Sequence, residues 1–190
     1  MSQNKVIALD IGGVCLHIRP ERCFGVLGYR AIGEVPPELL QSIDRFERGH
    51  LTEDEFLARF RQVTNSALSD DFVRNAWNAI LHAPMEGMAG QIRSWQRDGY
   101  RVVFFSDTSA MHMRDFRTRF PEIASLVPEG IYSFIVGAKK PEPAMFIAFE
   151  ADYGKPALYI DDREVCLEGG RAAGWPVHRF ESVSGLPELA

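Results

Sequence analysis

Five short apolar runs along the chain predict β-strands. They are VIALD (6–10), RVVFFS (101–106), YSFIVG (132–137), ALYIDD (157–162) and PVHRF (176–180). The first, second and fourth are almost continuously apolar, which is typical of strands buried on both faces of a parallel sheet. Apolar residues at helical spacing separate the later runs, over residues 85–97, 143–153 and 165–173, and a glycine follows each of these segments. Strands that alternate with helices in this way predict βαβ units and therefore an α/β fold.

A long segment between the first two predicted strands breaks this rhythm, and most of it has helical patterns. The predicted helices are Pro36 to Arg48, one opened by the capping box Thr52 to Glu55, and one capped by Ser69. The segment leaves the end of the first strand, and ligands of open α/β sheets bind beyond the carboxyl ends of their strands. We therefore predict a core domain of residues 1–16 and 86–190, with a helical cap, residues 17–85, inserted over the site.

Composition and charge describe an ordinary globular chain. It has 190 residues, a formal net charge of −5, 46% hydrophobic residues and 25% charged residues. This balance favours neither nucleic acid nor an anionic membrane as a partner. Its three cysteines do not have the spacing of a zinc site or a disulfide framework. Reduced thiols and the absence of a signal-like N-terminal pattern lead us to expect a cytoplasmic protein, and the oligomeric state stays open.

Polar side chains follow the predicted strands where each one ends. Asp10 ends the first strand, Ser106 ends the second, Lys140 follows the third, and the pair Asp161 and Asp162 ends the fourth. The carboxyl ends of parallel strands meet at one edge of a sheet, so these groups should converge on one crevice.

The reaction that uses such a set is phosphoryl transfer through an aspartyl intermediate, with Asp10 as the nucleophile. A carboxylate and a phosphate repel each other, so the attack needs a divalent cation, and Mg²⁺ prefers oxygen ligands. We expect Asp10, Asp162 and the carbonyl of Gly12 to bind Mg²⁺ directly. Asp161 should lie behind these ligands or bind the ion through a water molecule.

The remaining groups are predicted to bind the phosphate. The Ser106 hydroxyl would donate to a phosphoryl oxygen, and Lys140 would neutralise the phosphate and keep the nucleophile ionised. Gly12 and Gly13 permit a tight turn that would bring backbone N–H groups to the phosphate.

Four segments, ALDIGGV, VVFFSDT, KKPEPAMF and LYIDDREVCLEGGRAAG, occur in this order and cover most of the chain. Together they resemble the four motifs of the haloacid dehalogenase (HAD) superfamily of phosphohydrolases. The phrases RFERGHLTEDEF and SDTSAMH are similar to the branch that holds sugar-1-phosphate phosphatases and the N-terminal phosphatase domain of soluble epoxide hydrolases. The resemblance implies Mg²⁺ dependence and a helical cap of the C1 type. It also implies a doubly wound, mainly parallel five-stranded Rossmann-like sheet with the strand order 5-4-1-2-3, and a small sugar phosphate or related phosphometabolite as substrate.

The chain departs from this pattern at Gly12. Most phosphatases of the superfamily have an aspartate there, which protonates the leaving oxygen and then activates water, and such catalysis is worth roughly 10²–10⁴-fold. The groups that could replace it are His17, Asp107 and His112, and the latter two are also expected to contact substrate. Alternatively, the substrate has an easy leaving group, or the activity is slow or lost. A further departure is Cys166, where the fourth motif often has asparagine.

Three other functions compete with a phosphatase. Dehalogenation by the same fold needs no metal, but its usual form has tyrosine at the position of Gly12 and lacks the paired acids at 161 and 162. A receiver domain has its acidic pair early in the chain and no helical insertion, which is the reverse of the order found here. A non-catalytic phosphate-binding protein is supported by Gly12 alone.

Overall fold

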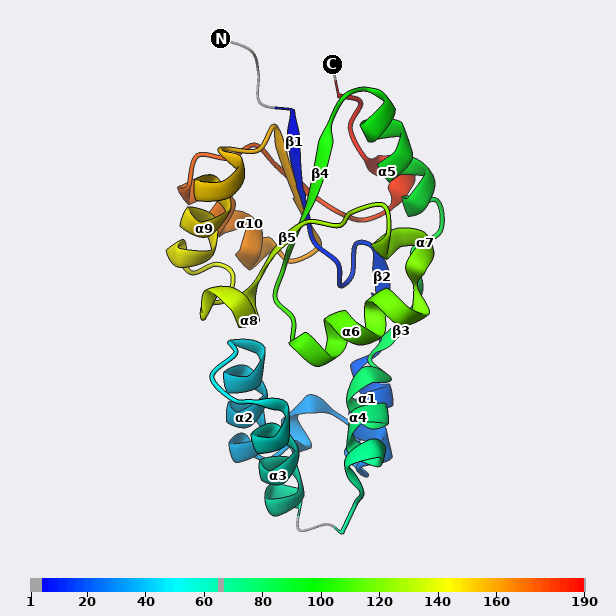
Figure 1. Cartoon of the computed structure of the whole chain (residues 1–190), viewed down its shortest axis with the longest axis vertical. Coiled ribbons are helices and arrows are strands. Elements are labelled where there is room, and N and C mark those ends of the chain that lie inside the picture. Colours follow the sequence, from blue (N-terminus) through cyan, green and yellow to red (C-terminus); the bar gives the residue numbers. More distant parts are fainter. Residues whose placement is uncertain (1–4, 65–66, 190) are drawn as a thin grey trace.

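The computed structural model describes residues 5–64 and 67–189, and its centre is a five-stranded sheet (Figure 1). The strands are β1 (Val6–Leu9), β4 (Arg101–Ser106), β5 (Gly130–Tyr132), β6 (Leu158–Asp161) and β7 (Val177–Arg179). They are arranged in the order β5-β4-β1-β6-β7, and all neighbours in the sheet are parallel. The expected α/β class and strand order are confirmed.

Helices cover both faces of this sheet because successive side chains of a buried strand point to opposite faces. In β1, Ile7 and Leu9 belong to one apolar cluster, and Val6 and Ala8 belong to the other. The first cluster is completed by α5 (Met88–Arg97), α6 (Ala110–Arg119) and α7 (Pro121–Ala124). The second is completed by α9 (Pro143–Tyr153) and α10 (Glu164–Ala172). Figure 1 shows these two groups of helices on either side of the strands, so the sheet is doubly wound.

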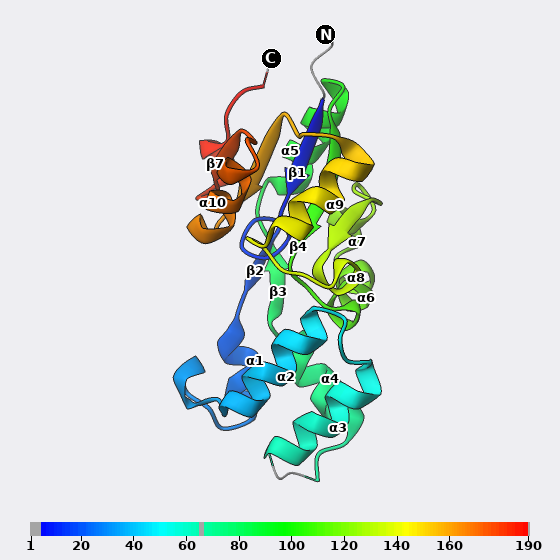
Figure 2. The same ribbon diagram turned by 90° about the vertical axis from the view of Figure 1, so that its left-hand side faces the viewer.

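A helical insert, defined here as residues 20–78, lies beyond the carboxyl ends of the strands (Figure 2). It contains α1 (Pro20–Val26), a 3₁₀ turn (Ile32–Glu34), α2 (Pro37–Glu47), α3 (Glu53–Thr64) and α4 (Asp70–Asn78). Its own apolar cluster includes the stacked rings of Phe46 and Phe56, 4.3 Å apart, and it takes in Met111 from α6. The insert therefore packs on the core through α6.

Both sequence-predicted caps of the insert are present. The Thr52 backbone N–H donates to the Glu55 carboxylate at 2.8 Å, and the Glu55 N–H donates back to the Thr52 hydroxyl at 3.2 Å. Ser69 accepts from the N–H of Phe72 at 3.2 Å. These contacts satisfy N–H groups that a helix start leaves unpaired.

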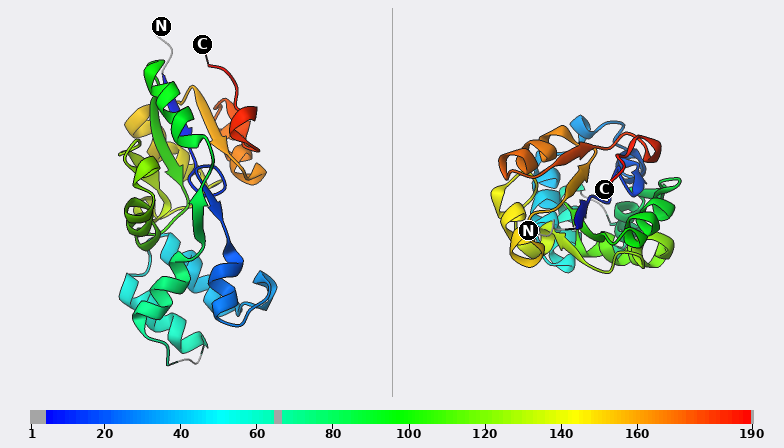
Figure 3. Two further views of the ribbon diagram at one scale, coloured as in Figure 1. Left: turned by 90° about the vertical axis from the view of Figure 1, so that its right-hand side faces the viewer. Right: turned by 90° about the horizontal axis from the view of Figure 1, so that it is seen from above.

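A two-stranded antiparallel ribbon, which sequence patterns did not predict, connects the core to the insert (Figure 3, left). It consists of β2 (Leu16–Ile18) and β3 (Leu81–Pro84). Leu16 and Leu81 pack in the same cluster as β1, whereas the insert has its own cluster. The ribbon thus lies across the predicted boundaries at 16/17 and 85/86, and the division into domains at those residues stays a prediction.

The predicted strand at residues 132–137 is wrong for most of its length. Tyr132 is the last residue of β5 and pairs with Ser106, which is the last residue of β4. No strand remains beyond that point for the chain to pair with, so Ser133–Val136 forms a short helix, α8, that ends at Gly137. The Ser133 hydroxyl oxygen lies 2.7 Å from the Glu47 carbonyl and 2.9 Å from the Thr108 carbonyl, either of which can accept its one proton, and the contact with Glu47 ties this turn to the insert.

The C-terminal part continues past β7 into a 3₁₀ turn, Val183–Gly185, that packs against the first cluster. Among residues 5–64 and 67–189, no helix has the length and apolar character needed to cross a lipid bilayer.

Candidate active site

The strand register brings three acidic residues to the same edge of the sheet. Leu9 is paired with Phe104 on one side and Ile160 on the other, so the residues that follow each of them lie at one level. One oxygen from each of Asp10, Asp161 and Asp162 lies within 4.8 Å of the others. The predicted convergence of these side chains is therefore found.

Lys140 lies beneath this cluster and is buried. Its Nζ is 3.1 Å from Asp10 Oδ1 and 2.6 Å from Asp161 Oδ2, and it donates to the Phe105 carbonyl at 2.8 Å. An ammonium group has three N–H donors. Here the Phe105 carbonyl and Asp161 Oδ2 accept hydrogen bonds from it, and Asp10 Oδ1 forms an ion pair with it. Lys140 thus neutralises carboxylates, and a contact with phosphate would have to replace one of these partners.

The three aspartates differ in their proton affinity. Burial raises the pKa of Asp10 to about 6, although Lys140 acts in the opposite direction. Burial would also raise the pKa of Asp161, but the charge and hydrogen bond of Lys140 outweigh it and lower that pKa. Burial and the neighbouring Asp161 raise the pKa of Asp162. The cluster accordingly has an excess of negative charge that Lys140 only partly balances.

The carboxylate oxygens of this cluster are suitable ligands for a hard divalent cation such as Mg²⁺. Asp162 Oδ1 is buried without a hydrogen-bond partner, and Asp10 Oδ1, also buried, accepts no hydrogen bond and has only its ion pair with Lys140. Asp161, in contrast, already accepts from Lys140, from the Tyr159 hydroxyl at 2.6 Å and from the Arg163 N–H at 2.9 Å. Buried carboxylate oxygens without donors are unfavourable unless a cation is bound. Asp10 and Asp162 are therefore the residues that would bind the ion directly, with Asp161 behind them.

Gly13 is the residue that permits this close approach. Its φ is +76°, and a Cβ at this position would lie 2.2 Å from Asp162 Oδ2. Only glycine satisfies both conditions. The Gly13 N–H donates to the Leu16 carbonyl at 2.9 Å. The ribbon turn thus uses this N–H, and the expected contact of the Gly12 and Gly13 backbone with a phosphate stays a prediction.

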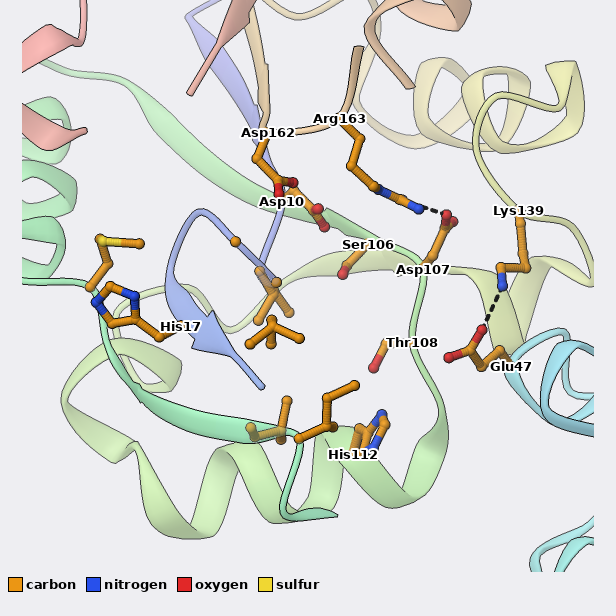
Figure 4. A pocket seen from close by; sticks show the side chains of 17 residues that line it. Asp10, His17, Glu47, Ser106, Asp107, Thr108, His112, Lys139, Asp162 and Arg163 are labelled. Carbon is orange, nitrogen blue, oxygen red and sulfur yellow. Dashed lines mark hydrogen bonds and ion pairs between the residues drawn. The ribbon is translucent and has the colours of Figure 1, made fainter. Parts of the chain in front are cut away.

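A cavity of about 450 Å³ opens above the carboxylates (Figure 4). Its polar lining includes Asp10, Gly12, Gly13, Ser106, Asp107, Thr108, His112, Asp162, Arg163, Lys139 and Glu47. Its apolar lining consists of Ile11, Ile18, Ile80, Leu81 and Met85, with His17 at the side. The cavity is thus shared by the core, the ribbon and the insert.

Both carboxylate oxygens of Asp107, which lines this cavity, accept hydrogen bonds from neighbouring residues. One of its oxygens accepts from the Lys140 backbone N–H at 2.9 Å, and the other accepts from the Arg163 guanidinium at 2.8 Å. Arg163 is about half exposed and faces the cavity. The sequence interpretation missed it, although its place directly after the paired acids was a usable signal.

Lys139 is a second cation that the sequence interpretation passed over. It lies 2.5 Å from Glu47 Oε2 and 3.6 Å from Asp44 Oδ1, both in α2 of the insert. Nearby, Arg48 of the insert forms two hydrogen bonds, of 2.7 and 3.0 Å, with Glu142 of the core. These ion pairs join the two parts at the rim of the cavity.

The two histidines near the site lie in different environments. His112 is buried, its Nε2 is 3.1 Å from the Trp77 carbonyl, and its ring stacks on Trp77 at 4.6 Å. Burial lowers the pKa of His112 to about 4. His17 is exposed on β2, and Figure 4 places it apart from Asp10 and Asp162. Cys166 is buried near Asp161 and Lys140 but is not among the residues that line the cavity.

Solved structures that superpose on most of this chain identify its fold. An HAD family enzyme from Bacteroides thetaiotaomicron, solved with magnesium and inorganic phosphate, superposes with a TM-score of 0.83 at 23% identity, covering 95% of this chain and 96% of that one. The chain has the haloacid dehalogenase-like fold. A predicted HAD-like hydrolase from Porphyromonas gingivalis matches with a TM-score of 0.80 at 23% identity, over 95% of this chain and 93% of its own.

A more distant structure with the HAD-like fold has different chemistry. The L-2-haloacid dehalogenase from Xanthobacter autotrophicus, with chloropropionic acid covalently bound, matches with a TM-score of 0.64 at 14% identity, over 93% of this chain and 77% of that one. No family model matches the chain. The fold is therefore shared by proteins of more than one activity, and the reaction must be argued from the site.

Proposed function

We propose that this protein is a Mg²⁺-dependent phosphomonoester hydrolase that acts on a small phosphorylated metabolite through an aspartyl-phosphate intermediate at Asp10. The observation that carries the proposal is a pair of buried carboxylate oxygens: Asp162 Oδ1 has no hydrogen-bond partner, and Asp10 Oδ1 has only the ion pair with Lys140. A bound Mg²⁺ would screen the nucleophile from an anionic substrate and polarise the phosphoryl group.

Within this proposal, each residue has a defined task. Asp10 attacks phosphorus, and Lys140 keeps the Asp10 carboxylate ionised from below. The Ser106 hydroxyl and the Arg163 guanidinium donate to phosphoryl oxygens from the sides of the cavity. Arg163 suits this task because Asp107 fixes its orientation while nearly half of its side chain stays exposed.

Two observations favour phosphate over an organic halide. Release of a halide needs no cation, whereas three facing carboxylates with one lysine are costly without one. Also, a structural neighbour that covers nearly the whole chain was solved with magnesium and phosphate. A dehalogenase would instead release halide from 2-halo acids without Mg²⁺.

The test is a screen of small phosphorylated metabolites and aryl phosphates, with Mg²⁺ and with EDTA. We expect Mg²⁺-dependent release of phosphate, its loss in Asp10→Asn, and its retention in Asp152→Asn. The latter makes the same chemical change at an exposed position of α9. Acid-quenched protein should carry one phosphoryl group on the peptide that contains Asp10. Phosphate binding without turnover in both wild type and Asp10→Asn would instead indicate a non-catalytic binding protein.

A further inference from the structure

The wall of the cavity next to Gly12 is apolar and filled. A Cβ added to Gly12 would lie 3.2 Å from Ile18 Cγ1 and 3.5 Å from its Cδ1. The Ile18 side chain thus occupies the space into which a side chain at position 12 would extend. Ile80 and Leu81 line the same cavity, so the apolar character continues across the ribbon.

Among the described residues that line the cavity, the side chains that could supply a proton either have a hydrogen-bond or ion-pair partner already or lie away from the carboxylates. The Nε2 of His112 faces the Trp77 carbonyl, and both oxygens of Asp107 accept hydrogen bonds. Glu47 is paired with Lys139 at 2.5 Å. His17 is exposed and set apart from the carboxylates (Figure 4).

A proton donor matters most when the leaving oxygen is strongly basic. An alkoxide must be protonated as it departs, whereas a phenolate or a carboxylate is stable as an anion. An apolar wall gives no help to an alkoxide but is compatible with an aromatic or acyl group. A site without a proton donor would therefore discriminate between substrates by the basicity of the leaving oxygen.

Building on the proposed function, we propose that this site transfers phosphoryl groups without general acid catalysis, and that its substrates are phosphates of weakly basic oxygens, namely aryl or acyl phosphates. In the first step the Asp10 oxygen forms a bond to phosphorus. The bond from phosphorus to the leaving oxygen breaks, and its electron pair departs on a phenolate or carboxylate anion. In the second step water attacks phosphorus, the Asp10 carboxylate leaves with its electron pair, and the proton of water passes to the departing phosphate.

The direct test is a series of aryl phosphates of increasing phenol pKa, assayed with saturating Mg²⁺. The measured quantity is kcat/KM, because it reports the steps up to transfer onto Asp10. We expect kcat/KM to fall by about 100-fold or more from 4-nitrophenyl phosphate to phenyl phosphate. Values that agree within about threefold would overturn the inference, because a proton donor compensates for the basicity of the leaving oxygen.

A pair of double variants tests whether the site lacks a proton donor. In Gly12→Asp with Ile18→Ala, the two atoms that obstruct position 12 are removed and a carboxyl group is added. In the matched control, Gly12→Asn with Ile18→Ala, the shape is the same but no acidic proton is available. We expect the aspartate variant to exceed the asparagine variant by about 10²-fold on phenyl phosphate and to differ little on 4-nitrophenyl phosphate. Equal rates of the two variants on phenyl phosphate would contradict the inference.

Other outcomes separate this inference from the proposed function. If both double variants misfold, the wild-type series decides alone. If His17→Gln lowers the rate for phenyl phosphate only, His17 is a proton donor and the inference is wrong, while the phosphatase proposal stands. If the wild type with Mg²⁺ hydrolyses alkyl phosphates but no aryl or acyl phosphate, the inference is wrong and the phosphatase proposal stands. If it releases phosphate from no compound of the screen, the proposed function itself fails.

Discussion

Replacing Asp10 by asparagine should stabilise the metal-free protein while abolishing its proposed activity. The Asp10 side chain is 5% exposed, and burial raises its pKa from 3.8 to about 6. Each pKa unit corresponds to about 1.4 kcal/mol, so the ionised carboxylate costs about 3 kcal/mol of folding free energy. An asparagine of the same shape avoids this cost, and its amide oxygen can still accept from Lys140.

The pH dependence of this gain has a definite sign. An acid whose folded pKa is raised destabilises the fold fully above the folded pKa and not at all below the unfolded pKa. The gain in Asp10→Asn should therefore be largest above about pH 7 and disappear near pH 4. Urea unfolding in EDTA at several pH values measures it.

The neighbouring Asp161 supplies an internal control of opposite sign. Its pKa is lowered because Lys140 outweighs burial, and its oxygens accept from Lys140, Tyr159 and Arg163. In Asp161→Asn an amide NH₂ must face one of these donors, so we expect a loss of about 3–5 kcal/mol. The reasoning is refuted if Asp10→Asn is no more stable than wild type at pH 8 in EDTA, or if both variants change stability in the same direction.

Three further predictions concern other parts of the site. Gly13→Ala would place a Cβ 2.2 Å from Asp162 Oδ2 on a left-handed backbone, so it should lower the free energy of unfolding by about 1–3 kcal/mol. It should also weaken Mg²⁺ binding, and thermal unfolding with and without the ion measures both effects. The pKa of His112 is lowered to about 4 in the folded protein, so the unfolded chain binds a proton at this residue between about pH 6.5 and 4 and the folded protein does not. His112→Gln should therefore reduce the loss of stability over that pH range by roughly 3 kcal/mol, as measured by unfolding at several pH values. Parallel profiles of variant and wild type would show that another group controls the loss. Arg48→Met removes the ion pair with Glu142 that joins insert and core. The free energy of unfolding should fall by no more than about 1 kcal/mol, and added salt should shrink this difference from wild type. A larger loss that salt does not change would show that Arg48 stabilises the protein through packing.

Much of the fold could be predicted from local patterns. The run RVVFFS coincides with β4, and the segment from Pro143 to Tyr153 coincides with α9. The ribbon β2–β3 was missed because its three- and four-residue strands carry no periodicity that distinguishes them from a loop. The end of β5 was misplaced because the apolar run YSFIVG continues beyond the last residue of its partner strand.

The sequence alone determined which polar residues stand at the ends of strands, because that follows from chain order and the alternation of strands and helices. It could not decide how these residues divide their tasks. Asp161 and Asp162 are adjacent, yet of the two only Asp162 has a buried oxygen without a hydrogen bond, because Tyr159 and Lys140 donate to Asp161. Likewise, only the tertiary structure places Ile18 beside Gly12. Such proximities depend on side-chain packing between distant segments, which local sequence patterns do not encode.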